Sequence, residues 1–336
     1  MSELVLSVVV IGRDEGARLE RCLKSIRGMK SPGGDFEIIY VDSASKDGSR
    51  ELAATYGAQV LSLETARPTA AKARNLGWRA AKAATILFLD GDTILDPDFA
   101  SSSIGEFADS RLAIVWGHRR EIAPENSIYN RVLDFDWVYP PGYTEFCGGD
   151  ALMRRRVLEE VGGFDGRFIA GEEPEMCNRI RQRGYLILHV DRPMTGHDLA
   201  MMRWGQYWKR AVRAGYAYAQ VAHRYWNSEH PLWKRDVISN VIRAGFLLAL
   251  PLAALVTSLW LASPIPVLAA ALIFILLVVR SAFRAGWKTK DPSTRVLYAA
   301  HSHFQQIPIF FGQLEYLWDR IRRQSRGLIE YKEPSQ

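Results

Sequence analysis

The sequence predicts an α/β fold, in which a mostly parallel sheet carries helices on both faces, followed by amphipathic and transmembrane helices toward the C-terminus. Two observations predict this organisation. Short apolar runs alternate with helical patterns over the first hundred residues, which is typical of a parallel sheet. Residues 244–279 are 36 consecutive residues without a charge, which is long enough for a membrane segment.

The first hundred residues can be followed element by element. Short apolar runs bounded by polar residues are expected as buried strands, at residues 4–11, 36–41, 60–63 and 86–89. Helices are expected where apolar or alanine residues recur at helical spacing, at residues 19–26, 50–56 and 69–84. Two later strands are expected at residues 112–116 and 186–190. The sequence has no GxGxxG after its first strand and no P-loop motif, which argues against dinucleotide binding and against a P-loop nucleotidase.

The composition narrows the choice of partners and compartment. The net charge of +6 and the pI near 9.2 suit nucleic acid, a phosphorylated substrate or an anionic membrane surface. Cys22, Cys147 and Cys177 are odd in number and far apart, so they fit no zinc pattern and a reducing compartment is expected. The N-terminus lacks the basic start and the long apolar core of a signal peptide.

Polar residues follow three of the predicted strands. The clusters are Arg13-Asp14-Glu15, residues 42–49, and Asp90-Gly91-Asp92. Because Asp90 and Asp92 lie two residues apart, their side chains share a face of an extended chain, and the carboxyl ends of parallel strands are where such sheets bind ligands. Paired carboxylates suit Mg²⁺ or Mn²⁺ held together with substrate phosphates. Each cluster alone also fits a turn or a helix cap, but together they predict a cation-assisted phosphate site.

Six motifs in this order resemble family 2 glycosyltransferases of the GT-A fold. They are GRDE (12–15), VDSASKDGS (41–49), ARNLG (73–77), LDGD (89–92), GGDALMRR (148–155) with GGFD (162–165), and GEEPE (171–175) with RIR (179–181) and GY (184–185). The resemblance covers roughly residues 4 to 200 and implies a Rossmann-like catalytic domain.

The resemblance implies a role for each matching position. Asp42, followed by Ser43, matches the carboxylate that binds the donor's base. Asp14 and Glu15, next to Arg13, match the nucleoside pocket, and Arg74 matches a residue near the donor phosphates. The metal ligands implied are Asp90 and Asp92, with Gly91 between them on the donor side and His197 as a third ligand.

For the acceptor half of the site, the resemblance implies residues but does not identify a single catalytic base. Glu173 matches the catalytic base, but the family often has Glu-Asp where this chain has Glu172-Glu173, so either glutamate is left open as the base. The acceptor-side residues expected are Gly149, Asp150, Trp137, Arg203 and Trp204. Trp137 lies in an aromatic and Pro-rich stretch, residues 134–146, that is either a lid or sugar-stacking surface or an ordinary packed loop.

The implied reaction is an inverting sugar transfer from a UDP- or GDP-type nucleotide sugar. A carboxylate removes the proton of the attacking hydroxyl, and a Mg²⁺ or Mn²⁺ cofactor offsets the charge of the leaving nucleoside diphosphate. A nucleotidyltransferase of similar fold is an alternative, although no Gly/Lys-rich triphosphate loop lies near residue 12. A non-catalytic membrane scaffold is another.

The uncharged run predicts a membrane hairpin. Ser263-Pro264-Ile265-Pro266 divides it into arms of about 19 and 15 residues. The hairpin either crosses the bilayer or is re-entrant, and a buried soluble helix pair is the alternative. Arg243 and Arg280 flank the outer ends, so the positive-inside rule places the catalytic domain at the cytoplasmic face of the cell inner membrane.

Aromatic and basic residues alternate between residues 201 and 235, which indicates either the membrane interface or nucleic-acid binding. The uncharged run that follows favours the membrane interface over nucleic-acid binding. Residues 294–326 are expected as an amphipathic interfacial helix, and a third crossing at 296–318 is disfavoured by its histidines and glutamines. The expected domains are 1–198 (catalytic), 199–240 (interfacial), 241–281 (hairpin) and 282–336 (interfacial).

A membrane anchor constrains the acceptor. A lipid-linked or polyprenyl-phosphate acceptor would reach a site held at the bilayer surface, with membrane lipids as further partners. A processive polysaccharide synthase is the nearby alternative, but its Gln-x-x-Arg-Trp element is reversed here as Arg203-Trp204-Gly205-Gln206, and one hairpin is too few helices for a channel. Single-sugar transfer is therefore expected.

Overall fold

A computed structural model describes residues 3–323 and divides them into two compact units. Among these described residues, the first unit holds 3–123 and 137–200, and the second holds 124–136 and 201–323. The expected catalytic domain ended at residue 198 and included residues 124–136, which the structure groups with the second unit. The last part of the expected domain 282–336, residues 324–336 with Arg326, lies outside the described residues.

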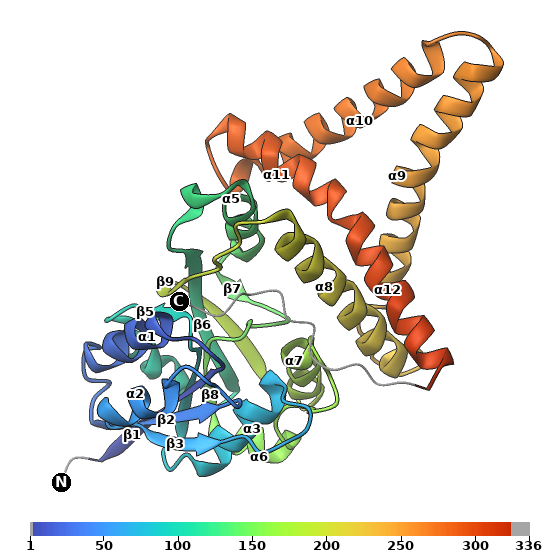
Figure 1. Ribbon diagram of the computed structural model, residues 1–336. Coiled ribbons are helices and arrows are strands. Elements are labelled where there is room, and N and C mark those ends of the chain that lie inside the picture. Colours follow the sequence, from blue (N-terminus) through green and yellow to red (C-terminus); the bar gives the residue numbers. More distant parts are fainter. Residues whose placement is uncertain (1–2, 324–336) are drawn as a thin grey trace. The chain divides into compact units, whose positions relative to one another are not determined.

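The first unit is built on one mixed sheet with helices on both faces, as predicted (Figure 1). Within the described residues, the strand order of this sheet is β3-β2-β1-β4-β8-β6-β9-β5, and β7 pairs with β9. The strands are β1 Leu4–Gly12, β2 Asp35–Asp42, β3 Gln59–Ser62, β4 Thr85–Asp90, β5 Thr93–Leu95, β6 Leu112–Glu121, β7 Gly142–Tyr143, β8 Ala151–Arg154 and β9 Leu186–His197. The first four strands are parallel, whereas β8 is antiparallel to both β4 and β6. Fully buried side chains of β1, β2 and β4 form the centre of the core.

The helices of this unit are α1 Ala17–Arg27, α2 Ser49–Thr55, α3 Ala70–Ala80, α4 Phe99–Ser103, α6 Arg155–Val161 and α7 Glu172–Gln182, with the 3-10 turn η1 Ile104–Ala108. The 3-10 turn η3 Phe135–Trp137 begins in the second unit and ends in the first. The helix expected at 69–84 ends at Ala80, because Ala81 has extended backbone angles and β4 begins at Thr85. The strands expected at 112–116 and 186–190 continue to Glu121 and His197 through polar residues that the apolar pattern did not include.

The second unit is helical. Its elements are η2 Pro124–Asn126, α5 Ile128–Asp134, α8 Trp204–Tyr225, α9 Lys234–Trp260, α10 Ile265–Arg284, η4 Ala285–Trp287, α11 Pro292–Phe304 and α12 Gln306–Ile321. The single amphipathic helix expected at 294–326 is therefore two helices within the described part. Helices α8 and α12 pack at glycines: a Cβ on Gly215 would lie 1.9 Å from the Ile309 carbonyl oxygen, and one on Gly312 would lie 2.0 Å from that of Val212.

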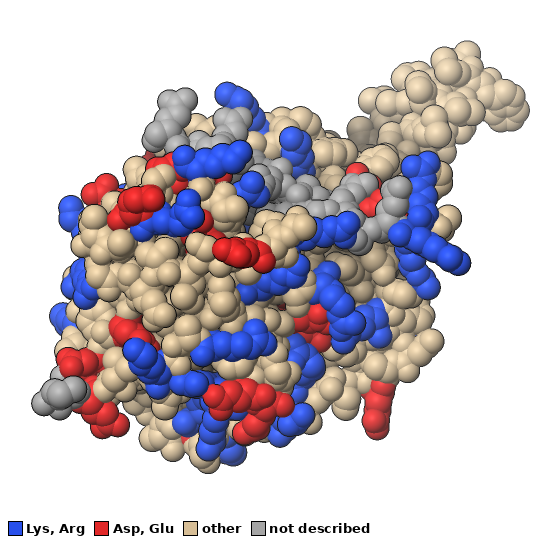
Figure 2. All heavy atoms as spheres, turned by 60° about the horizontal axis from the view of Figure 1, so that its bottom comes forward, with Lys and Arg blue, Asp and Glu red and all other residues tan. Residues whose placement is uncertain are grey.

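Two described helices, α9 and the α10–η4 segment, are long and apolar enough to cross a membrane. They are not buried core helices, since large side chains such as Leu259 (75% exposed) and Trp260 (82% exposed) face outward along them. In Figure 2 the tip of this hairpin shows no blue or red spheres. At ~1.5 Å per residue, the uncharged part of α9, residues 244–260, extends about 26 Å, which is close to the ~30 Å hydrocarbon core of a bilayer.

Candidate active site

The sheet register brings the predicted strand ends together. In the parallel ladder Gly12 pairs with Asp42 on one side, and Ile11 pairs with Asp90 on the other. The three polar clusters that follow β1, β2 and β4 therefore lie at one edge of the sheet. This is the edge at which open α/β sheets bind ligands.

Strand β5 brings a histidine to the paired carboxylates. Thr93, directly after Asp92, pairs with His197 at the end of β9. One ligand atom from each of Asp90, Asp92 and His197 lies within 4.8 Å of the other two, and His197 Nε2 is 3.5 Å from Asp92 Oδ1. Two carboxylates and an imidazole form a donor set that fits Mg²⁺ or Mn²⁺, so these residues could hold a divalent cation.

Arg74 connects this triad to the start of α7. It is buried on α3, and its guanidinium donates to Asp90 Oδ1 at 2.7 Å and to Glu172 Oε1 at 2.8 Å. Burial alone would lower the pKa of Arg74, but the carboxylates of Asp90 and Glu172 outweigh it and raise that pKa above its ordinary value. Arg74 therefore stays charged and fixes the positions of both carboxylates.

Asp150 supports Asp90 from within the protein. Its carboxylate accepts hydrogen bonds from the Asp90 backbone N–H and from Thr195 Oγ1, both at 3.0 Å, and lies 3.1 Å from Arg119. Burial raises the pKa of Asp150, while Arg119 opposes that shift. Asp150 is fully buried and contacts Asp90 directly, while a contact between Asp150 and an acceptor stays a prediction.

Arg119 was not among the site residues predicted from the sequence, because it belongs to the extension of β6 beyond residue 116. This extension, Gly-His-Arg-Arg-Glu at 117–121, has no apolar–polar alternation, so no local sequence pattern indicated a strand there. Its guanidinium lies over the Trp137 ring at 5.6 Å, and Trp137 contacts His197 with ring centroids 4.8 Å apart. The structure therefore places the expected acceptor-side residue Trp137 beside the triad.

Gly149 is a glycine for steric reasons. A Cβ at this position would lie 2.8 Å from Arg74 Nη2 and 3.0 Å from Asp90 Oδ2. Any larger residue would displace the Arg74–Asp90 ion pair. The expected acceptor-side pair Arg203-Trp204 belongs to the second unit, where Arg203 caps α8 and Trp204 stacks on Tyr207 with ring centroids 5.3 Å apart.

The two candidate bases have different environments at the N-terminus of α7. Glu172 is paired with Arg74. Glu173 Oε1 accepts hydrogen bonds from the Cys147 backbone N–H at 2.7 Å and from the thiols of Cys177 at 2.9 Å and Cys147 at 3.2 Å. Burial raises the pKa of Glu173 above its ordinary value of 4.5, although these hydrogen bonds oppose the shift.

The loops after β1 and β2 are joined by their own polar groups. Asp14 Oδ1 accepts from the Lys46 backbone N–H at 2.7 Å, and the Asp14 N–H donates to Ser45 Oγ at 2.9 Å. Asp42 is buried and accepts from the Ser45 N–H at 3.0 Å. These contacts, with Glu15 paired to Arg18 at 2.8 Å, give the expected nucleoside-binding loops a fixed shape.

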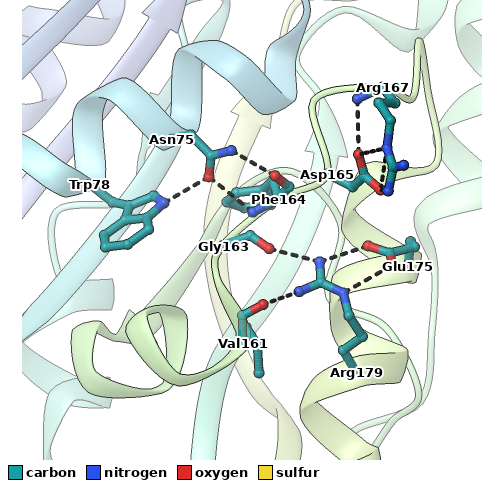
Figure 3. Close-up of polar contacts among 9 residues, drawn as sticks. All are labelled: Asn75, Trp78, Val161, Gly163, Phe164, Asp165, Arg167, Glu175 and Arg179. Carbon is teal, nitrogen blue, oxygen red and sulfur yellow. Dashed lines mark hydrogen bonds and ion pairs between the residues drawn. The ribbon is translucent and has the colours of Figure 1, made fainter.

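The ARNLG and GGFD motifs form a structural clamp, shown in Figure 3. Asn75 Nδ2 donates to the Phe164 carbonyl at 2.6 Å, and Asn75 Oδ1 accepts from the Phe164 N–H at 2.9 Å and from Trp78 Nε1 at 2.8 Å. On the other side of the turn, Arg179 donates to the Gly163 carbonyl at 2.7 Å and pairs with Glu175. The clamp holds α3, which carries Arg74, against α7, which carries Glu172 and Glu173.

Replacing Asn75 with Ala should therefore destabilise the first unit. It removes three buried hydrogen bonds and leaves their partners unsatisfied, which should cost about 3 kcal/mol. The measurement is the thermal unfolding midpoint in detergent, with the exposed Asn126→Ala as the matched control. An unchanged midpoint for Asn75→Ala would contradict the clamp.

Comparison with known proteins gives the family. Residues 7–162 match the family described as "Glycosyl transferase family 2", and residues 85–283, more than half of the chain, match "Glycosyl transferase family group 2". "Glycosyltransferase AglE" of Haloferax volcanii is 22% identical over 261 residues, which cover 73% of this chain and 79% of AglE. "Validoxylamine A glucosyltransferase" of Streptomyces hygroscopicus subsp. limoneus is 26% identical over 220 residues, and this match covers 54% of this chain and 48% of that protein.

Solved structures support the fold. The mannosyltransferase PcManGT from Pyrobaculum calidifontis, solved in complex with GDP-Man and Mn²⁺, superposes with a TM-score of 0.62 at 21% identity, covering 94% of this chain and 87% of that one. S. aureus TarS 1-349 gives a TM-score of 0.51 at 13% identity, covering 90% and 92%. The predicted GT-A fold is confirmed, and the chain belongs to family 2 of the glycosyltransferases.

Proposed function

We propose that this glycosyltransferase moves one sugar, with inversion, from a nucleoside-diphosphate sugar to a lipid-linked acceptor at the cytoplasmic face of a membrane. The observation that carries the proposal is Arg74, which joins the cation-type triad to the paired glutamates of α7 through ion pairs of 2.7 and 2.8 Å. Donor-side and base-side groups are thereby held in one connected site.

The donor half rests on the edge formed by β1, β2 and β4. The Asp14 and Asp42 loops are expected to bind the nucleoside, and Asp90, Asp92 and His197 to hold Mg²⁺ or Mn²⁺. The bound cation would neutralise the charge that develops on the departing diphosphate. PcManGT, which resembles this chain in fold, was solved with GDP-Man and Mn²⁺, so GDP- and UDP-sugars are the first donors to test.

The acceptor half rests on α7. Glu173 is assigned as the general base, because Glu172 already pairs with Arg74 while a raised pKa suits Glu173 to taking a proton. Its carboxylate would remove the proton of the acceptor hydroxyl as the oxygen attacks the anomeric carbon. Trp137, beside His197, offers a ring for the transferred or acceptor sugar.

The exposed apolar hairpin of α9 and α10 supports a membrane location and hence a lipid acceptor. A polyprenyl-phosphate or lipid-linked sugar would enter from the bilayer, and the donor would come from the cytoplasm. The test is a screen of GDP- and UDP-sugars with Mn²⁺, with and without polyprenyl phosphate in vesicles. Transfer to the lipid would support the proposal, and Mn²⁺-dependent turnover that no lipid acceptor stimulates would contradict it.

The hairpin should cross the bilayer. With Ser263→Cys in the turn, we expect a membrane-impermeant maleimide to label this thiol only from the side opposite the cytoplasm, because Arg243 and Arg280 keep the outer ends inside. The three native cysteines are buried, and Ser110→Cys on the exposed surface of the first unit is the matched cytoplasmic control. Labelling of both thiols from the cytoplasm alone would identify a re-entrant hairpin.

A further inference from the structure

Two cysteines converge on the same oxygen of Glu173. Cys177 lies one turn after Glu173 on α7, and Cys147 comes from the loop before β8. The two sulfurs are 3.7 Å apart, and they lie 2.9 and 3.2 Å from Glu173 Oε1. All three side chains are buried, and none of these contacts is needed for the proposed proton transfer.

The three donor atoms have the spacing of a tetrahedral thiolate site. With Zn–S bonds of ~2.3 Å and a Zn–O bond of ~2.0 Å, tetrahedral geometry places two sulfurs ~3.8 Å apart and each sulfur ~3.5 Å from the oxygen. The observed sulfur–sulfur distance of 3.7 Å matches the first separation. The sulfur–oxygen distances of 2.9 and 3.2 Å would have to lengthen by about 0.6 and 0.3 Å, which side-chain rotation of Glu173 can supply. The sequence showed no zinc pattern because 29 residues separate the cysteines and the third donor is a glutamate.

We propose that Cys147, Cys177 and Glu173 form a binding site for a thiophilic divalent cation of the Zn²⁺ class. This site differs in chemistry from the Asp90-Asp92-His197 triad, because two thiolates select softer ions than carboxylates and imidazole do. Its effect on turnover rests on the proposed function: a cation bound to Glu173 occupies the carboxylate assigned as the base, so binding inhibits transfer.

Binding exchanges protons for metal bonds without any redox change. Burial raises the pKa of Cys147 to about 12 and that of Cys177 well above its ordinary value, so both are thiols that donate to Glu173 when no cation is bound. As two metal–sulfur bonds form, two thiol protons leave to solvent, and the carboxylate exchanges its thiol hydrogen bonds for a metal–oxygen bond.

Co²⁺ tests the site directly, because thiolate coordination gives a charge-transfer absorption band that oxygen and nitrogen ligands do not. The full-length protein in detergent with a non-chelating phosphine reductant should show this band at one Co²⁺ per chain, and Zn²⁺ should remove it. Cys147→Ser and Cys177→Ser, tested separately so that one can misfold without ending the test, should each weaken Co²⁺ binding at least about tenfold. Cys22→Ser, at a buried cysteine outside the cluster, and Asp92→Asn should keep the band.

Several results would overturn the proposal. These are a wild-type protein without the band, a band that survives both cysteine substitutions, or inhibition that disappears with reductant and so reflects a disulfide. In the activity assay, Zn²⁺ should inhibit Mn²⁺-supported transfer, and Cys177→Ser should weaken that inhibition. A cobalt band without zinc inhibition would support the site but overturn its inhibitory effect and the assignment of Glu173 as base, so the two failures are distinguishable.

Discussion

Replacing Asp92 with Asn should lower Mn²⁺-dependent kcat/KM by about 10³-fold while the protein stays folded. Asn has nearly the same shape as Asp but carries no negative charge, so it weakens both the attraction for a divalent cation and the compensation of charge on the leaving group. Asp92 is buried beside His197, with Oδ1 3.5 Å from Nε2, so water cannot easily replace the lost carboxylate.

Turnover and cation binding should be measured together. Mn²⁺ should raise the unfolding temperature of the wild-type protein but not that of Asp92→Asn. Asp98→Asn is the matched control, because Asp98 is an exposed carboxylate a few residues away that pairs with Lys30. Normal Mn²⁺-dependent turnover in Asp92→Asn would contradict the assignment of the triad as the metal site, and with it the donor half of the proposed mechanism.

Much of the sheet could be predicted because parallel strands buried on both faces are short continuous apolar runs. This holds for β1, β2 and β4, and with them for the edge that carries Asp42 and Asp90. The apolar pattern does not mark β8, whose four residues follow a Gly-rich motif, or the outer half of β9, where polar residues such as Arg192 and Thr195 interrupt it. The long-range pairing of β5 with β9 has no local signal.

In the candidate site too, some features could be predicted from the sequence and others could not. The carboxylates at the strand ends and His197 could be predicted from motif order, but the contacts that position them could not. Arg119 and Asp150 meet only when β6 and β8 pair in the folded sheet. The difference between Glu172 and Glu173 likewise arises from Arg74 and Cys147, which are distant in sequence from α7.

Replacing Glu173 with Gln should reduce kcat by about 10²- to 10⁴-fold with little change in donor binding. The amide oxygen can still accept hydrogen bonds from the Cys147 N–H and the neighbouring thiols, so the local structure should survive. It cannot take the acceptor's proton. Donor affinity, measured separately by calorimetry with the nucleoside diphosphate, should stay near the wild-type value.

The pH profile decides between the two glutamates. Because burial raises the pKa of Glu173 above 4.5 and the carboxylate is the active form, wild-type activity should fall as the pH drops through that raised value. The residual activity of Glu173→Gln should lack this acid limb, whereas Glu172→Gln should keep it and instead weaken the site by leaving Arg74 with one carboxylate partner fewer.

Stability provides an independent check on the same group. A carboxyl whose pKa is raised on folding favours the folded state when protonated, so the wild-type protein loses stability as the pH rises from 4.5 through the raised value. Gln does not ionise, so Glu173→Gln avoids this loss of folding stability. The variant should therefore unfold at the same or a higher temperature than the wild-type protein at pH 7. If Glu172→Gln abolishes the acid limb and Glu173→Gln keeps it, the base is Glu172, and Arg74 must then release that carboxylate during each turnover.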